Sequence, residues 1–223
     1  MRTGLVTAHP DDEAMFFTPF LSYTLEQHSH VYVLCLSSGD AQGLGLVRRK
    51  ELVNALHNVF GLNAKHIRLI DDPRLADGMQ EHWPEHRVAA HVKDFVREFS
   101  LDLLVTFDER GVSGHPNHIA CFQGVERVCE ALPGLHGWCL ESPGLLRKYS
   151  GPLDILTTWI LNRCSWDKVF VTLDFLQSYR AMEAHASQFV WYRRLFVLFS
   201  RFSWVCSFRA IQCSVPVRDG RRD

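Results

Sequence analysis

Short apolar runs alternate along the chain with longer segments in which apolar residues recur at helical spacing. The short runs predict strands at residues 5–8, 31–36, 67–70 and 103–107. The longer segments predict helices over residues 13–27, 46–60, 84–99 and 115–132. Strands that alternate with helices at this pitch form βαβ units, in which helices cover both faces of a parallel sheet. The sequence therefore predicts an α/β protein with a Rossmann-like, mainly parallel sheet.

The pattern is less regular after residue 134. Residues 137–140 and 169–173 predict two more strands, the second of them the last, and a helix is expected from about residue 174. Residues 189–208 fit one basic amphipathic helix, whose apolar face would hold Leu195, Leu198, Phe199, Phe202, Val205 and Cys206 and whose polar face would hold Arg193, Arg194, Ser200, Arg201 and Ser207. This pattern indicates contact with a membrane interface, while docking on the core explains it equally well. The predicted organisation is an α/β domain over residues 1–188, this helix over 189–208 and a polar tail over 209–223.

Composition narrows the class of protein. Hydrophobic residues make up 47% and charged residues 22%, which is typical of a soluble globular chain. Lys and Arg number 24 against 25 Asp and Glu, so a nucleic-acid partner is not expected. Residues 180–223, however, hold eight Arg, no Lys and three acids, which favours an anionic partner such as a membrane surface. No apolar run reaches the roughly 18–20 residues of a membrane span, and residues 1–8 are too short for a cleavable signal peptide.

The seven cysteines predict no disulfide framework and no cysteine-based zinc site. Their number is odd, they are scattered, and no CxxC occurs. Most lie in apolar runs, where buried free thiols are common, and a reducing compartment fits them best.

Candidate chemistry follows two of the predicted strands directly. Residues 8–13 read Ala-His-Pro-Asp-Asp-Glu after the first strand, and residues 107–118 occupy the equivalent place after the fourth. Carboxyl ends of parallel strands are where α/β sheets bind ligands, so the two loops are expected to meet. Two His and one carboxylate with an open position suit a catalytic zinc ion, although Fe(II), Co(II) or Mn(II) accept the same ligands. Asp11 would then serve as general base on water, and His115 would stabilise an oxyanion or protonate a leaving amine, which suits amide hydrolysis.

Each motif alone has a simpler interpretation. Acids at a helix start complement its positive end, so Asp11, Asp12 and Glu13 need have no catalytic role. His115 and His118 could be ordinary polar loop residues. The matched positions of both motifs at strand ends favour the functional interpretation.

The sequence resembles the LmbE-like (PIG-L) zinc de-N-acetylases. Residues 8–13 and the later Gly-His-Pro-Asn-His at 114–118 carry this resemblance. Residues 12–17, 112–114, 146–149 and 187–194 are similar to the eukaryotic branch, which hydrolyses the N-acetyl group of N-acetylglucosaminyl-phosphatidylinositol to the glucosaminyl lipid and acetate in GPI-anchor biosynthesis. The resemblance implies a glycolipid substrate and a place on the cytoplasmic face of the endoplasmic reticulum membrane.

The resemblance also implies roles for single residues. His9, Asp12 and His118 would bind Zn²⁺, Asp11 would be the general base, His115 the oxyanion or acid partner, and Arg48 a substrate contact. Asp108 is a candidate to orient His115, with an ordinary turn acid as the alternative. His185 is a candidate to face the site, although a lone histidine on a helix is more often structural. Two other functions stay open: a soluble de-N-acetylase of a non-lipid N-acetylglucosamine conjugate, and a non-catalytic metal-binding scaffold subunit.

Overall fold

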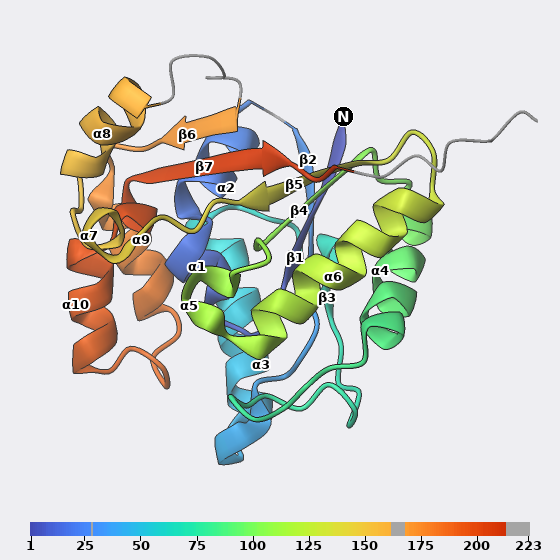
Figure 1. The fold of residues 1–223 in the computed structure, drawn as a ribbon. Helices are drawn as coiled ribbons and strands as arrows, with labels where there is room; N and C mark the ends of the chain where they lie inside the picture. Colours follow the sequence, from blue (N-terminus) through green and yellow to red (C-terminus); the bar gives the residue numbers. More distant parts are fainter. Residues whose placement is uncertain (28, 162–167, 213–223) are drawn as a thin grey trace, which may run out of the picture.

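A seven-stranded sheet runs through the computed structural model, which describes residues 1–27, 29–161 and 168–212 (Figure 1). The strand order is β3-β2-β1-β4-β5-β7-β6. Strands β3, β2, β1, β4 and β5 are parallel to one another, whereas β7 is antiparallel to both β5 and β6. The bounds are β1 Arg2–Thr7, β2 His30–Cys35, β3 Ile67–Leu69, β4 Leu103–Thr106, β5 His136–Leu140, β6 Val169–Val171 and β7 Val205–Ala210.

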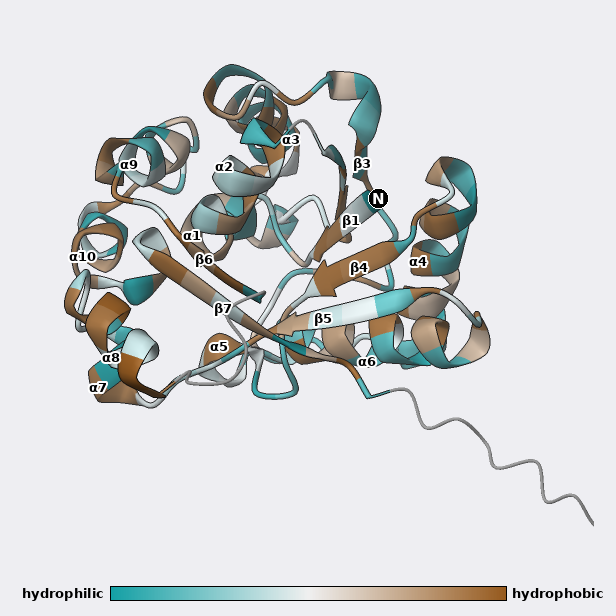
Figure 2. Ribbon diagram, turned by 90° about the horizontal axis from the view of Figure 1, so that it is seen from above, coloured by the Kyte–Doolittle hydropathy of each residue, from teal (hydrophilic) through white to brown (hydrophobic). Residues whose placement is uncertain are grey.

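Helices cover both faces of the sheet (Figure 2). The helices α4 (Glu85–Phe99) and α6 (Pro116–Ala131) pack together on one face. On the other face lie α1 (Asp12–Phe16), α2 (Thr18–Glu26), α3 (Gly45–Asn54), which a π-helical turn at Ala55–Val59 extends, and α9 (Phe175–Glu183). The shorter α7 (Leu145–Lys148) and α8 (Leu153–Leu161) lie beside α10 (Trp191–Phe199) at the β6–β7 end of the sheet. Within the described residues, no helix is long and apolar enough to span a bilayer.

The predicted fold class is confirmed. The four N-terminal strands lie within two or three residues of their predicted places. All but the edge strand β3 are largely buried on both faces, because helices cover the parallel sheet. Cys35, Cys121, Cys139 and Cys206 are buried free thiols, as the sequence predicts, whereas Cys164 and Cys213 lie outside the described residues.

The helix predicted over residues 13–27 is divided in two at Phe17. Pro19 stands in the first turn of α2, where its missing N–H is not needed. In a continuous helix the same proline would remove a hydrogen bond and clash with the carbonyl of Met15. The break lets α1 stay as a short helix at the end of β1.

The helix predicted over residues 189–208 is wrong in its second half. The structure has α10 at Trp191–Phe199, a 3₁₀ turn at Arg201–Ser203 and then strand β7, which lies between β5 and β6. A short apolar run covered on both faces cannot be told from a helical segment by periodicity. Val205 and Cys206 are therefore inside the sheet, and the boundary predicted between residues 208 and 209 falls within β7.

The polar face predicted for this helix is also wrong. Arg201 is 1% exposed, and its Nε lies 2.6 Å from Oδ2 of the fully buried Asp154 in α8. Arg147 at the end of α7 binds the other carboxylate oxygen at 2.8 Å. A buried charge is tolerated only where such partners compensate it, so this cluster ties α7 and α8 to the turn before β7.

Replacing Asp154 by Asn should lower the free energy of unfolding by about 3 kcal/mol, because two arginines would lose their buried counter-charge. Urea unfolding followed by circular dichroism measures this change. The matched control is Glu85→Gln, which removes the same charge from an exposed ion pair with Arg127 and should have a much smaller effect. Equal stability losses in the two variants would contradict a structural role for the buried cluster.

Candidate active site

The site lies where the loops after β1 and β4 meet at the carboxyl edge of the sheet. These strands are adjacent and parallel, and β1 is also the point from which the strand order runs in both directions. Such a reversal opens a crevice in which α/β proteins bind ligands. His9, Asp12 and His118 are brought together there, each at most 5% exposed. The two sequence motifs therefore meet, as their positions predict.

Asp12 is the centre of the site. Its Oδ2 accepts hydrogen bonds from the backbone N–H groups of Ala8 and His9, at 3.0 and 2.8 Å. Its Oδ1 lies 3.1 Å from Nε2 of His118. Burial alone would raise the pKa of Asp12, but the charges of His118 and His9 and the hydrogen bonds hold it well below its usual range. The carboxylate is therefore ionised and ready to bind a cation.

The imidazole of His9 is fixed by two oxygen atoms. Its Nε2 lies 3.0 Å from Oδ1 of Asn117 and 3.0 Å from Oδ1 of Asp77. The amide of Asn117 is oriented because its Nδ2 donates to the carbonyl of Glu81 at 2.8 Å. Two acceptors at Nε2 require a proton there, so Nδ1, which lies 3.8 Å from Oδ2 of Asp12, is the nitrogen left to bind a metal. Burial would lower the pKa of His9, but the bond to Asp77 and the surrounding carboxylates raise it.

His118 is oriented in the same way from the opposite side. Its Nδ1 lies 3.2 Å from the carbonyl oxygen of Gly111, so this nitrogen carries a proton, and Nε2, which faces Asp12, is the nitrogen that could bind a metal. The ring stacks on Phe107 with centroids 3.9 Å apart and 4° between the planes. A partner on the far nitrogen is how proteins orient histidines that bind metals.

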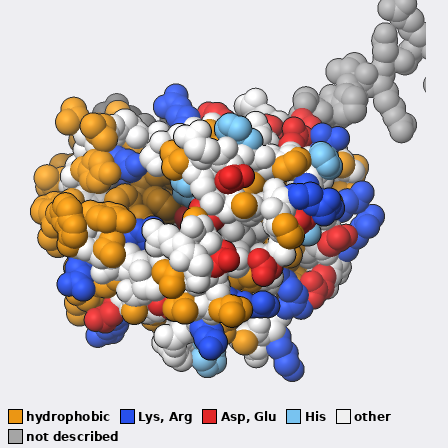
Figure 3. All heavy atoms as spheres, turned by 90° about the horizontal axis from the view of Figure 1, so that it is seen from below, with side chains coloured by type: hydrophobic (Ala, Val, Ile, Leu, Met, Phe, Trp, Pro, Cys, Tyr) orange, Lys and Arg blue, Asp and Glu red, His pale blue; other side chains and the backbone are white. Residues whose placement is uncertain are grey.

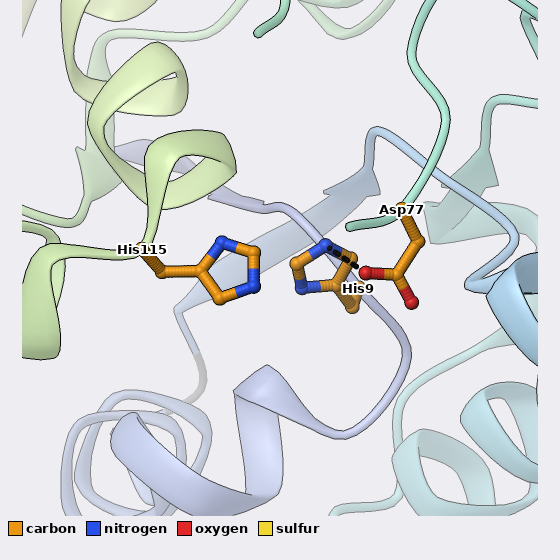
Figure 4. A group of neighbouring side chains, drawn as sticks. All are labelled: His9, Asp77 and His115. Atoms are coloured by element: carbon orange, nitrogen blue, oxygen red, sulfur yellow. Dashed lines mark ion pairs between the residues drawn. The ribbon is translucent and has the colours of Figure 1, made fainter. Parts of the chain in front are cut away.

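Among the residues that the structure describes, two groups of side chains could hold a metal ion, and both contain His9. One is His9, Asp12 and His118, and the other is His9, Asp77 and His115. Figure 4 shows the second group, with the ring of His9 between His115 and Asp77. In that group Nε2 of His9 is already bonded to Asp77, and two of the three residues are partly exposed. The first group fits an ion better, because all its members are buried and both histidines direct at Asp12 the nitrogen that is left to bind a metal.

Asp11 lies beside this group with an unusual backbone. Its φ of 116° and ψ of −20° are rare for a residue with a side chain, and its N–H donates to Oε2 of Glu13 at 3.1 Å. Its Oδ2 forms an ion pair with Arg193 and lies 3.4 Å from Nη2 of Arg48. Burial raises the pKa of Asp11 against the opposing charges of these two arginines. A raised pKa suits a carboxylate that must accept a proton.

Arg48 reaches into the site from α3. Its Nη2 donates to the carbonyl of Pro10 at 2.8 Å, and its Nη1 donates to that of Gly39 at 2.8 Å and to Oδ2 of Asp77 at 3.1 Å. The side chain is buried. Its guanidinium therefore links Asp11 and Asp77 on one wall of the site, where the resemblance predicted a substrate contact.

His115 lies on the open side of the site. Its ring centroid is 4.9 Å from that of His9 and 4.7 Å from that of His118. Burial and the charges of these two histidines lower the pKa of His115 to about 4. Its Nδ1 accepts a hydrogen bond from the N–H of Asn117 at 3.3 Å, so the neutral ring carries its proton on Nε2. A neutral imidazole of this kind is a hydrogen-bond donor at pH 7.

The hydrogen bonds of Asp108 brace the second loop. Its oxygens accept from Oγ and the N–H of Ser142, at 2.6 and 2.8 Å, and from the N–H of Arg110 at 3.2 Å. Ser142 in turn accepts from the N–H of Val112 at 3.0 Å. Asp108 therefore holds the backbone before His115, as the alternative interpretation of a turn acid predicted. The orientation of the His115 ring does not come from Asp108.

His185 lies behind Asp11. It is fully buried in the turn after α9, and its Nε2 forms an ion pair with Oε1 of Glu13. The other carboxylate oxygen of Glu13 holds the N–H of Asp11. His185 thus reaches the site through Glu13, and burial, which would lower its pKa, is outweighed by the charges of Glu13 and Asp11.

Comparison with known proteins agrees with this geometry. The PIG-L family, described as GlcNAc-PI de-N-acetylase, matches residues 5–129. The chain belongs to this family. It is 40% identical to a probable N-acetylglucosaminyl-phosphatidylinositol de-N-acetylase of Schizosaccharomyces pombe, over 88% of this chain and 82% of the relative. It is 39% identical to the N-acetylglucosaminyl-phosphatidylinositol de-N-acetylase of Bos taurus, over 90% and 80%.

Solved structures share the PIG-L fold at low sequence identity. N,N'-diacetylchitobiose deacetylase from Pyrococcus horikoshii superposes with a TM-score of 0.63 and 13% identity, over 98% of this chain and 88% of that one. The family match includes both sequence motifs, Arg48 and Asp77, whereas α7 to α10 lie beyond it.

Sequence reasoning missed three residues of this PIG-L site. Asp77 lies in an irregular segment after β3. The sequence feature that could have identified it is the presence of acids in the loop after a third parallel strand. Asn117 was noted only as part of the motif at residues 114–118, whereas its role comes from its bond to His9. Arg193 was placed on the polar face of the predicted amphipathic helix, but it points to Asp11.

The two candidate metal groups can be separated by substitution. His118→Ala should lose bound zinc, because it removes one of three ligands from the group that contains Asp12. Asp77→Asn should keep zinc near one equivalent, because it removes no ligand from that group and changes only the partner of His9 and Arg48. Elemental analysis after zinc loading and dialysis measures both, with circular dichroism to check folding. Zinc kept in His118→Ala and lost in Asp77→Asn would place the ion in the other group.

Proposed function

We propose that this protein is a zinc-dependent de-N-acetylase that hydrolyses N-acetylglucosaminyl-phosphatidylinositol to the glucosaminyl lipid and acetate. The observation that carries the proposal is Asp11, a buried carboxylate with a raised pKa next to two histidines and a carboxylate that converge on one point. The substrate comes from the names of the relatives, which share about 40% of their residues with this chain over most of its length.

The group of His9, Asp12 and His118 would hold the metal. Two histidines and one carboxylate leave a position open for catalysis, and they accept zinc as well as other divalent transition metals. A zinc ion bound there would polarise the acetamide carbonyl and make water a better nucleophile at neutral pH.

The neighbouring side chains would carry the proton transfers. Asp11 takes a proton from the water that attacks the amide carbon. The neutral His115 donates a hydrogen bond from Nε2 to the oxygen that gains negative charge. When the C–N bond breaks, the proton held by Asp11 goes to the nitrogen, which leaves as the amine. Arg48, which already links Asp11 and Asp77, would orient the sugar.

An apolar surface next to the site supports a lipid substrate. We call it the apolar face, and it consists of exposed large side chains on α7, α8 and α10: Leu145, Leu146, Leu153, Leu156, Trp159, Ile160, Leu161, Trp191, Leu195, Leu198 and Phe199. Figure 3 shows hydrophobic side chains gathered around a hollow at this end of the molecule. So much exposed apolar surface indicates a partner, and Trp side chains favour the membrane interface. The protein would act at the cytoplasmic face of the endoplasmic reticulum membrane. Failure of the protein to sediment with lipid vesicles would exclude contact between the apolar face and a membrane.

The first test is acetate release from N-acetylglucosaminyl-phosphatidylinositol in mixed micelles. We expect activity that a chelator removes and added zinc restores. Cleavage of only a soluble N-acetylglucosamine conjugate would identify the non-lipid de-N-acetylase. Full zinc occupancy without release from either substrate would identify a scaffold subunit.

Asp11→Asn should lower kcat by about 10²- to 10⁴-fold and leave the zinc content unchanged, because an amide cannot accept the proton from water. Asp94→Asn is the matched control, since Asp94 is exposed on α4, away from both loops. Steady-state acetate release and elemental analysis measure the two effects. Full turnover in Asp11→Asn would remove Asp11 from the role of base.

A further inference from the structure

A cavity under α10 adjoins the site. It encloses about 340 Å³, and apart from one arginine its lining is apolar or aromatic. Met15, which belongs to the same short helix as Asp12, forms its inner wall. Tyr149, Leu195 and Phe199 line it toward the surface, where each is exposed. The cavity therefore leads from the site to the apolar face.

Within the described part of the chain, Arg193 is the only charged residue that lines this cavity, and it also contacts the site. Its Nη1 pairs with Oδ2 of Asp11, and it donates to Oε1 and to the carbonyl of Gln188, at 3.0 and 3.3 Å. The side chain is 22% exposed, so an incoming anion can reach it. Arg48 stays beside Asp11, so this carboxylate keeps a positive neighbour when Arg193 turns to another anion.

The order of chemistry along this path matches the order of groups in a glycophospholipid. Polar and metal-binding groups lie at the inner end, one guanidinium follows, and an apolar cavity and the apolar face come last. A guanidinium can bind a phosphate through two parallel N–H bonds, which gives it both affinity and direction. A volume near 340 Å³ lies at the lower end of ligand pockets and suits part of a lipid rather than the whole.

We propose that Arg193 and the cavity under α10 form a subsite for the phosphodiester and diacylglycerol of the substrate. Arg193 exchanges its ion pair with Asp11 for one with the lipid phosphate, which leaves Asp11 free to accept a proton from water. The glycerol and the first part of the acyl chains lie between Met15, Leu195 and Phe199, while the rest of the chains stay in the membrane against the apolar face. This inference rests on the proposed function.

Three substrates separate the parts of the subsite. They are the intact lipid, its deacylated form that keeps the glycerophosphate, and N-acetylglucosaminyl-inositol, which has neither phosphate nor lipid. Arg193→Gln should lower the preference for the glycerophosphate form over the inositol form, as a ratio of kcat/KM, by about 10- to 100-fold. Arg193→Lys should restore part of it, because lysine keeps the charge and loses the paired bonds.

Leu195→Gln tests the apolar part. It should lower the preference for the intact lipid over its deacylated form by roughly fivefold, since it replaces apolar surface of the cavity by an amide. Leu176→Gln is the matched control: Leu176 is 56% exposed on α9 against 47% for Leu195, and it lies outside the cavity lining. This control should leave the ratio unchanged.

The outcomes distinguish the inference from the function beneath it. Arg193→Gln that slows all three substrates equally would show that Arg193 only holds Asp11, and the subsite would be wrong. A wild-type protein that cleaves the three substrates with equal kcat/KM would also overturn the subsite while the de-N-acetylase function stands. No acetate release from any substrate would overturn the proposed function itself.

Discussion

The arrangement of the site depends on one buried carboxylate. Asp12 binds the backbone after β1 through Oδ2 and faces His118 of α6 through Oδ1. It therefore joins two loops that are about one hundred residues apart in the sequence. Both histidines turn one nitrogen toward it because oxygens of Asn117, Asp77 and Gly111 hold their other nitrogens. The site is therefore a network rather than three independent ligands.

Backbone strain is concentrated at the same place. Asp11 has a φ of 116° and the β-branched Val112 a φ of 64°, and both conformations persist only where the surroundings enforce them. The buried pair of Glu13 and His185 holds the N–H of Asp11. Asp108 does the same for Val112 through Ser142. Asp108 and His185, which the sequence could place only near the site, therefore support the backbone of the site.

Local patterns in the sequence were enough to predict the parallel sheet and the meeting of the two motifs. Strand and helix periods are properties of neighbouring residues, and the carboxyl edge of a parallel sheet is a general binding place. Asp77 could not be found in this way, since its segment has no period and only the tertiary fold brings it to His9. The same limit explains β7, which is buried on both faces, and Arg201, whose partner Asp154 lies 47 residues earlier in the chain.

The helix predicted over residues 189–208 is wrong in its second half, and this changes how a membrane contact is understood. A basic amphipathic helix would lie on anionic lipid with its arginines toward the headgroups. In the structure Arg201 is buried with Asp154 and Arg193 turns inward to Asp11, so apart from Arg194 the exposed residues of α10 are aromatic and aliphatic. Attraction to lipid would then come from apolar area more than from charge, so raised ionic strength should weaken vesicle binding only slightly. Because Arg193 would meet a phosphate at the site itself, salt should affect the recognition of substrate more than attachment to the membrane.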